Sequence, residues 1–448
     1  MEKKNKMETM PMGRLVFGMS LPMMLSLLIQ SLYNIVDSIF VARLSEQALT
    51  ATSLAYPVQM LMIAVGVGTA VGVNVRLSQT LGKKDEEEAS RIAQTGIVLA
   101  VISAVVFMAA GLAGAKLLAE RFTDDAVVSG QCADYLWICM VFCLGNMACM
   151  VFQRLLQAAG KAVLSMVILI SGAIVNLILD PVLIFGLLGF PALGIRGAAW
   201  ATVIGQWVSM LVGIYLNLAK NPQVRLTGNG FSLRKERIWG IYKVGIPTII
   251  TQAMISLMVS AFNAILLPIS GTAVAFFGVY YKLQNFLFMP MNGLGQAAIP
   301  IVGYNYGARN RARIKEASKV VYIAAAVIAV IGTAVFQLFG RPLLGIFSAS
   351  EAMLEIGVPA LRVISVSFLP AAVTMITGYL ASGLGDGVTN MVGAFLRQFV
   401  PLLPCAYLLS KIGGVGALWY AFWISEVVGI LFSVCRMSRL RRGKLREL

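Results

Sequence analysis

A single carboxylate interrupts the stretch Gln30-Ser31-Leu32-Tyr33-Asn34-Ile35-Val36-Asp37-Ser38-Ile39-Phe40, which lies inside an apolar run from Leu15 to Val41. About 20 apolar residues cross the hydrocarbon core of a bilayer, so this run is predicted to span a membrane. An acid at that depth is expensive to insert, and by default it marks an ion or substrate pathway. We therefore expect Asp37 to lie on such a pathway.

The 448 residues are 58% hydrophobic and only 12% charged, with a mean hydropathy of +0.82. Soluble domains carry roughly 25% charged residues, so this composition is typical of a polytopic membrane protein. Histidine is absent, which excludes imidazole metal ligands and histidine proton relays. Any proton chemistry must therefore fall to carboxylates.

The net charge of +16 comes from basic residues at the ends of the apolar runs rather than on one polar face. That distribution is typical of cytoplasmic loops beside anionic lipid. We therefore expect the lipid bilayer, and no nucleic acid, as a partner. The six cysteines lie mostly in apolar runs without paired C-x-x-C spacing, and we interpret them as core-packing thiols.

Twelve apolar runs predict an all-α polytopic membrane protein with about twelve transmembrane helices. They lie near 15–41, 50–76, 92–118, 135–158, 163–188, 195–219, 241–268, 273–303, 318–339, 357–382, 388–409 and 414–435. If the N-terminus is inside, alternate connections and the C-terminal tail hold most of the Lys and Arg residues. This bias predicts a multi-pass protein of the cell inner (cytoplasmic) membrane with both termini cytoplasmic.

The two halves of the chain repeat each other at a constant offset of 225 positions. The matching pairs include Pro22 and Pro247, Ser45 and Ser270, Tyr56 and Tyr281, Gln59 and Gln284, and Gly82 and Gly307. Each half holds six spans, so the repeat predicts two pseudo-symmetric six-helix bundles. We expect an N-terminal lobe at 1–219, a cytoplasmic linker at 220–240 and a C-terminal lobe at 241–448. Two such bundles rocking about a central cavity are a recurrent alternating-access design, which favours a monomeric transporter.

The repeat also exposes a difference between the halves. Polar residues of the first half correspond to apolar residues of the second: Asp37 to Phe262, Asn34 to Val259, Asn176 to Pro401, Asp180 to Cys405 and, through a shorter offset, Thr202 to Ala421. The two halves are therefore expected to share one fold, and only the N-terminal half has the residues of a cation site at these positions.

The spacing of these polar residues predicts that they share helix faces. Asn176 and Asp180 are four residues apart, and Asn34 and Asp37 are three apart. Their oxygens, together with that of Thr202, can converge on a hard cation such as Na⁺. Alternatively, the two carboxyl groups can share a proton. A third interpretation is that Asp37 and Asp180 are separate acids, each pairing with a basic residue or lining a wet cleft.

Several stretches resemble the multidrug and toxic-compound extrusion (MATE) family. They are Tyr33-Asn34-Ile35-Val36-Asp37 after Pro22, Asn176-Leu177-Ile178-Leu179-Asp180-Pro181, Gly197-Ala198-Ala199-Trp200-Ala201-Thr202 and Gly295-Gln296-Ala297-Ala298-Ile299-Pro300-Ile301-Val302-Gly303-Tyr304-Asn305-Tyr306-Gly307-Ala308. The similarity runs essentially end to end, and it is nearest to the prokaryotic branches with a cation site in the N-terminal lobe. It implies that Asp37, Asn176, Asp180 and Thr202 form a H⁺ or Na⁺ site. It also implies that the first helix bends at Pro22.

The C-terminal lobe holds one deep acid, Glu426. Either it titrates as a second site or lines a cavity, or it pairs with Arg397. Other side chains are candidates for contact with lipophilic cations, because aromatic faces and flexible thioethers suit such ligands. With Glu426, the candidate substrate contacts are Tyr33, Gln59, Met258, Tyr281 and Gln284. Alternatively, these rings and sulfurs simply pack between helices.

The chain shows no Walker A loop, no Ser-His pair and no metal centre, so we expect neither an ATPase nor any other enzyme, and no cofactor. The expected function is cation-coupled (H⁺ or Na⁺) antiport that exports lipophilic, often cationic drugs by alternating access. The alternative is a lipid-linked saccharide flippase of the same superfamily. The scarcity of mid-span Arg and Lys argues against the broad charged cavity that such a flippase needs.

Overall fold

The computed structural model describes residues 5–226, 233–347 and 349–446. They form two compact units. The first unit is Leu25–Ile249, and the second combines the described residues up to Met24 with those from Ile250 onward. These boundaries differ from the lobes expected at 1–219 and 241–448, and the division into lobes stays a prediction.

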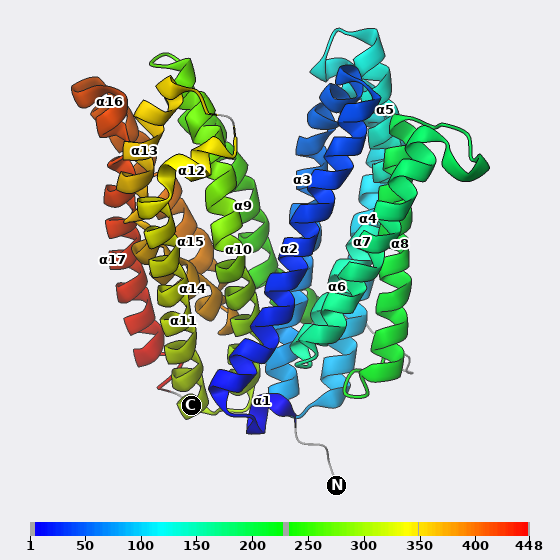
Figure 1. The fold of residues 1–448 in the computed structure, drawn as a ribbon. Helices are drawn as coiled ribbons and strands as arrows, with labels where there is room; N and C mark the ends of the chain where they lie inside the picture. Colours follow the sequence, from blue (N-terminus) through cyan, green and yellow to red (C-terminus); the bar gives the residue numbers. More distant parts are fainter. Residues whose placement is uncertain (1–4, 227–232, 348, 447–448) are drawn as a thin grey trace. The chain divides into compact units, whose positions relative to one another are not determined.

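The first unit is built from long helices that pack side by side (Figure 1). Helix α8 packs against α7 and α6, and α3 packs against α4 and α6. The helices are α2 (Met12–Leu44) from Leu25 onward, α3 (Glu46–Gly82), α4 (Glu86–Phe122), α5 (Ala126–Val141), α6 (Leu144–Ala158), α7 (Ala162–Phe185), α8 (Ile195–Lys220) and the start of α9 (Lys235–Leu266). A short 3₁₀ turn, η1 (Leu187–Gly189), follows α7.

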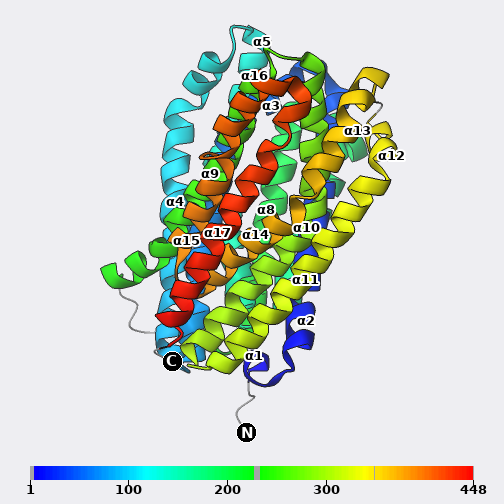
Figure 2. The ribbon, with the colours of Figure 1, turned by 90° about the vertical axis from the view of Figure 1, so that its left-hand side faces the viewer.

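In the second unit, α14 lies against α10, α11 and α17 (Figure 2). The unit also includes a short helix, α1 (Lys6–Thr9), the start of α2 and the rest of α9. Its remaining helices are α10 (Gly271–Gly307), α11 (Arg311–Leu338), α12 (Gly340–Gly345), α13 (Glu351–Ser365), α14 (Phe368–Gly383), α15 (Gly387–Gln398), α16 (Leu402–Leu418) and α17 (Ala421–Arg442).

Among the described residues, ten helical segments are long and apolar enough to cross a membrane, and two bent pairs raise the possible number to twelve. No strand occurs in the described ranges. The expectation of an all-α polytopic membrane protein is therefore confirmed.

The internal repeat recurs in the helix boundaries and in their capping. Helices α3 and α10 begin and end at positions 225 apart, and they are capped by Ser45 and Ser270 at the same offset. Each serine hydroxyl accepts a hydrogen bond from the third backbone N–H of its helix, an interaction worth about 1 kcal/mol. Asp125 and Ser350, also 225 apart, cap α5 and α13. The N-cap residues that begin these helices thus lie at equivalent positions in the two halves.

Two predicted spans are bent rather than straight. The run at 135–158 divides into α5 and α6 with a bend of 46°, and the run at 357–382 divides into α13 and α14 with a bend of 51°. The two breaks lie at equivalent places in the repeat. In the second, the Ser367 hydroxyl donates to the carbonyl of Ile364 at 2.7 Å, and such a side-chain bond competes with continuation of the helix.

The predicted limits of other segments also need correction. The expected division between the runs at 388–409 and 414–435 falls at a backbone break, because Gly413 and Gly414 have non-helical dihedral angles inside α16. The next helix, α17, begins only at Ala421. The expected linker at 220–240 includes the first residues of α9, and its residues 227–232 lie outside the described ranges. Four cysteines are buried as expected, whereas Cys405 is half-buried and Cys435 is exposed, so the last does not pack in the core.

Candidate cation site

The candidate site lies on α7 because that helix is continuous where its repeat partner is broken. Asn176 and Asp180 occupy one face of α7. The residue equivalent to Asn176 is Pro401, which stands between α15 and α16. Proline lacks the N–H of a helix interior and favours a break, although α7 itself tolerates Pro181 next to Asp180. In the second half the helix is interrupted at Pro401 and the residue equivalent to Asp180 is Cys405, so the two polar groups have no counterpart on one unbroken helix there.

Small residues hold α8 against α7 at the level of the site. A Cβ atom at Gly205 would lie 2.7 Å from the carbonyl oxygen of Gly172 and 3.2 Å from the Cβ of Asn176. A Cβ at Gly197 would lie 2.4 Å from the carbonyl oxygen of Leu183. Only hydrogen atoms fit at these crossings, which is how small residues let helices approach closely in membranes. This close approach is what brings Thr202 on α8 to Asn176 on α7.

The polar groups meet within the first unit, where Asp37 and Thr202 are half-buried. The Nδ2 of Asn176 donates to Oδ1 of Asp180 at 3.3 Å and to Oγ1 of Thr202 at 3.4 Å. Asp180 has no exposed surface, and Asn176 is 4% exposed. The carboxyl group of Asp37, from α2, lies within hydrogen-bonding reach of that of Asp180. The structure thus brings together Asp37, Asn176, Asp180 and Thr202.

A second layer of polar groups surrounds the two carboxyl groups. The hydroxyl groups of Tyr33 on α2 and Tyr135 on α5 both lie within electrostatic range of Asp37 and Asp180. Gln59, on α3, donates from Nε2 to the hydroxyl of Tyr135 at 3.2 Å. Tyr33 and Gln59, which the sequence suggests as substrate contacts, therefore lie around the candidate cation site, and their role in substrate contact stays a prediction.

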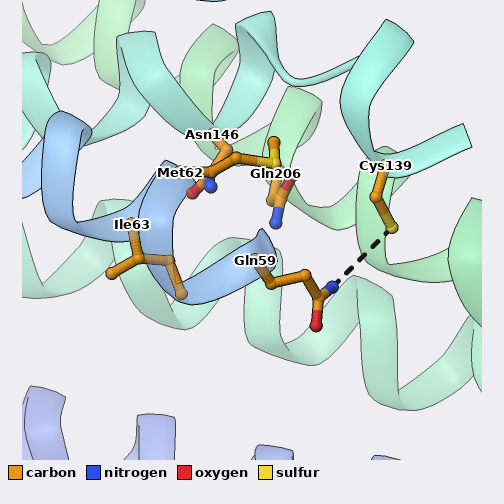
Figure 3. Close-up of a pocket in the computed structure, with 6 residues that line it drawn as sticks. All are labelled: Gln59, Met62, Ile63, Cys139, Asn146 and Gln206. Carbon is orange, nitrogen blue, oxygen red and sulfur yellow. Dashed lines mark hydrogen bonds between the residues drawn. The ribbon is translucent and has the colours of Figure 1, made fainter. Parts of the chain in front are cut away.

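A small cavity of about 40 Å³ opens beside Gln59 (Figure 3). Gln59 also contacts Sγ of Cys139 across it, at 3.8 Å. This volume suffices for a water molecule, and the polar lining supplies the partners that a buried water needs. The lining residues are Gln59, Met62, Ile63, Cys139, Asn146 and Gln206.

Other nominated residues lie elsewhere. Asn34 is exposed, and within the described part of the chain its side chain makes no hydrogen bond to this cluster, so the structure does not bring it to the site. Met258, Tyr281, Gln284 and Glu426 belong to the second unit, as does the proposed hinge residue Pro22, which lies inside an unbroken α2. Their roles in substrate contact and bending stay predictions.

Three residues near the site, Tyr135, Cys139 and Asn146, are not among those predicted from the sequence. All three lie in apolar surroundings without a motif, so periodicity gave no reason to select them. The repeat did contain a signal, because the equivalent residues of the second half are Ala360, Ile364 and Ala371. These are the same polar-to-apolar differences that identified Asp37 and Asp180.

The chemistry of the site follows from its donors. Two carboxyl groups, an amide and a hydroxyl in a buried place suit a hard monovalent cation, or a proton shared between the carboxyl groups. In the described ranges, no group of three or more His, Cys, Asp or Glu side chains is placed to hold a metal ion. The residues Asp37, Asn176, Asp180 and Thr202 fit Na⁺ through oxygen ligands, and the paired carboxyl groups fit H⁺ equally well.

Comparison with known proteins identifies the class. The MatE family model matches residues 22–182 and 247–408, two segments whose first residues are 225 positions apart. The chain therefore belongs to the MatE family of multidrug efflux transporters, which are not enzymes, and it is a multi-pass membrane protein.

Particular relatives support this assignment along the whole chain. "Multidrug export protein MepA" of Staphylococcus haemolyticus is 26% identical over 425 residues, covering 94% of this chain and 92% of the relative. The protein of that name from Staphylococcus aureus is 26% identical over 441 residues, covering 97% and 95%. A solved structure described as an outward-facing conformation of a multidrug resistance MATE family transporter has a TM-score of 0.89 and 25% identity, covering 98% and 99%.

The close approach of α7 and α8 gives a first testable prediction. We expect Gly205→Ala to push the helices apart, because its Cβ would meet the backbone oxygen of Gly172 at 2.7 Å. The contact between Asn176 and Thr202 should lengthen, and efflux should fall by about tenfold for a loss of roughly 1.4 kcal/mol in coupling.

The matched control is Gly114→Ala on α4, because a Cβ there has nothing within 4 Å. That change should leave efflux unaltered and slightly raise stability, since alanine is the better helix former. Efflux and thermal stability of both variants are measured in the same membranes. Equal efflux by the two variants would contradict the packing argument.

Proposed function

We propose that this transporter exports lipophilic, often cationic compounds in exchange for H⁺ or Na⁺ bound at Asp37 and Asp180. The observation that carries the proposal is the completely buried Asp180 with its carboxyl group beside that of Asp37. Two adjacent carboxylates in an apolar interior repel each other and are poorly solvated. They therefore gain from a bound cation or a shared proton, and that dependence makes them suitable as a coupling site.

The chain's own residues have distinct parts in this mechanism. Asp180 and Asp37 bind the cation or proton. Asn176 orients Asp180 by donating to its carboxyl group, Thr202 accepts from Asn176, and both supply further oxygen atoms. Binding neutralises the pair and allows α2 to take up a different position relative to α7. Pro22 is the proposed place for bending, because proline removes one backbone hydrogen bond of a helix.

The energetics suffice for accumulation. A membrane potential of 100 mV contributes about 2.3 kcal/mol for each net charge moved inward, which sustains roughly a fifty-fold concentration ratio of a neutral compound exchanged for one cation. One-for-one exchange of a monovalent cationic compound moves no net charge, so the concentration gradient of the coupling ion drives its export. In this scheme the cation enters from outside, lowers the affinity for the compound, and is released inside. We place both termini on the cytoplasmic side, in agreement with the basic connections and tail.

Ethidium efflux from energised vesicles tests the proposal. We expect efflux to stop when the coupling gradient is collapsed, either by a protonophore or by equal Na⁺ on both sides. Loss with the first treatment alone identifies H⁺, and loss with the second alone identifies Na⁺. Efflux that survives both treatments would overturn cation coupling. Transport of a lipid-linked saccharide in place of ethidium would favour the flippase.

A further inference from the structure

The second unit contains a buried ion pair that the proposed cation site does not use. Nε of Arg397, on α15, lies 3.4 Å from Oε1 of Glu426, on α17. The side chains are 17% and 9% exposed. A buried charge pair is no guarantee of stability, since desolvation offsets much of the attraction, so its presence here requires an explanation.

The pair is not inherited from the duplication. The positions in the first half that correspond to Arg397 and Glu426 are Gly172 and Trp207. Conversely, Asp37 corresponds to Phe262, which has no exposed surface and stacks on Phe277 with ring centroids 4.5 Å apart. The second unit thus fills the place of the first acid with aromatic rings and carries its own acid elsewhere.

The surroundings of Glu426 leave Arg397 as its one charged neighbour within the described residues. Helix α10 contributes the hydroxyl of Tyr280, which is buried and within electrostatic range of both ions. Helix α14 contributes Thr374, whose Oγ1 would lie 3.0 Å from a Cβ at Gly429, one turn beyond Glu426. The titratable side chains of α16 are at least partly exposed: Cys405, Tyr407 and Lys411.

The backbone fixes the geometry of the pair. The hydroxyl of Ser425 donates to the carbonyl oxygen of Arg397, which ties α17 to α15 beside the ion pair. In the described part of the chain, Oε2 of Glu426 and Nη1 of Arg397 have no hydrogen-bond partner. Among the described residues, each charge is therefore the other's charged partner.

We infer that Arg397 keeps Glu426 ionised, so that Glu426 does not take up the coupling ion and the transport cycle depends on the first unit alone. Arginine remains charged under all physiological conditions, so it supplies a permanent counter-ion. Protonating Glu426 would leave a buried guanidinium unpaired, which is far more costly than keeping the neutralised pair. Arg397 thereby determines how many carboxyl sites exchange ions. This role rests on the proposed coupling at Asp37 and Asp180, although the state of Glu426 is measured separately.

Labelling with dicyclohexylcarbodiimide tests the inference, because this reagent reacts with protonated carboxyl groups in apolar surroundings. Membranes containing the full-length protein are treated at neutral pH, and labelled peptides are quantified by mass spectrometry. We expect little label on Glu426 in the wild type and at least tenfold more in Arg397→Met, where the acid neutralises itself by binding a proton. Equal labelling in the two proteins would overturn the inference.

Stability supplies a second readout that keeps the test valid if one variant folds poorly. Glu426→Gln should lower the melting temperature more than Arg397→Met, because arginine cannot discharge whereas glutamic acid can. The double variant should recover most of the loss. An opposite order of the single variants, or additive losses in the double variant, would contradict the inference. Labelling of Asp37 and Asp180 in the same samples reports on the proposed function independently.

Discussion

Asp180→Asn is expected to abolish cation-driven efflux, by at least a hundredfold, while the protein remains folded in the membrane. Asp180 is completely buried, and its carboxyl group meets Asp37 and the amide of Asn176. The amide side chain keeps the size and most of the hydrogen-bonding capacity of the acid but cannot bind a proton or carry charge. The substitution should therefore abolish the coupling of efflux to the cation gradient and leave the stability of the fold largely unchanged. Asp37→Asn should give the same phenotype, since the two carboxyl groups act together.

Efflux and binding must be measured separately in these variants. We expect ethidium to bind to purified Asp180→Asn protein with little change in affinity, while vesicle efflux driven by either gradient is lost. The matched control is Asp134→Asn, which makes the same chemical change in an exposed ion pair with Arg196. Exposed pairs contribute about 0–1 kcal/mol, so this control should transport normally. Full efflux by Asp180→Asn would overturn the assignment of the coupling site.

Much of this site was predictable because the chain contains its own comparison. The offset of 225 converts a single sequence into two aligned halves. Four of the five positions selected for a difference in polarity meet in the first unit, whereas Asn34, paired with Val259, does not. Asp37, Asn176, Asp180 and Thr202 were selected in this way, and their contacts are now seen. Tyr135 was not selected, although its counterpart Ala360 carries the same signal. The repeat therefore carries a signal for Tyr135 as well.

Other features could not be predicted, for physical reasons. The breaks between α5 and α6 and between α13 and α14 lie in apolar sequence and are accompanied by individual hydrogen bonds. The Ser367 hydroxyl donates to the carbonyl of Ile364 at the second break, and Nε1 of Trp207 donates to the carbonyl of Phe142 at the first. Hydropathy averages over such details. Asn34 is a residue that helical spacing selected but the structure does not bring to the site. Its spacing places it on the same helix face as Asp37, whereas the structure leaves it exposed. Spacing alone fixes an angle around a helix and does not say which neighbours will cover that angle.

The division into two units shows a feature that no sequence motif predicts, namely that two helices belong to both units. One unit begins at Leu25 and the other resumes at Ile250, so α2 and α9 pass from one unit to the other at positions 225 apart. Each crossing lies about one turn beyond a proline, Pro22 in α2 and Pro247 in α9. The symmetry of the boundaries shows that duplication reproduced the crossing as well as the bundles.

Two equivalent positions, Glu88 and Arg313, contact the start of α9 and the residues just before α2, and the chemistry of the two contacts differs. In the second unit, Nη2 of Arg313 donates to the carbonyl oxygens of Met7 and Met10 at 3.0 and 2.8 Å. In the first unit, the equivalent residue is Glu88, which accepts two hydrogen bonds from Arg237 at the start of α9, both at 2.8 Å. The guanidinium of Arg313 thus binds backbone oxygens in the second unit, whereas the carboxylate of Glu88, at the equivalent position of the first unit, binds the guanidinium of Arg237.

Glu88→Ala is expected to destabilise the start of α9 by about 2–3 kcal/mol, somewhat less than the loss of a fully buried partner because Glu88 is itself partly exposed. Arg237 is 4% exposed, whereas the side chain of Glu88 is 32% exposed. The variant leaves a buried guanidinium without its bidentate carboxylate, and arginine cannot relieve this by losing a proton. Hydrogen exchange should therefore accelerate in the first turns of α9, and the melting temperature of the purified protein should fall.

The matched control is Glu351→Ala, which removes a carboxylate that receives both its bonds from Arg341 at 3.0 and 3.2 Å. Those side chains are 68% and 77% exposed, so water replaces the lost partner and the expected change is below about 1 kcal/mol. If both variants shift the melting temperature equally, the charge pair at α9 is merely a surface contact. If only Glu88→Ala acts, and exchange increases in α9 while α7 and α8 stay protected, the first unit anchors the helix that crosses out of it.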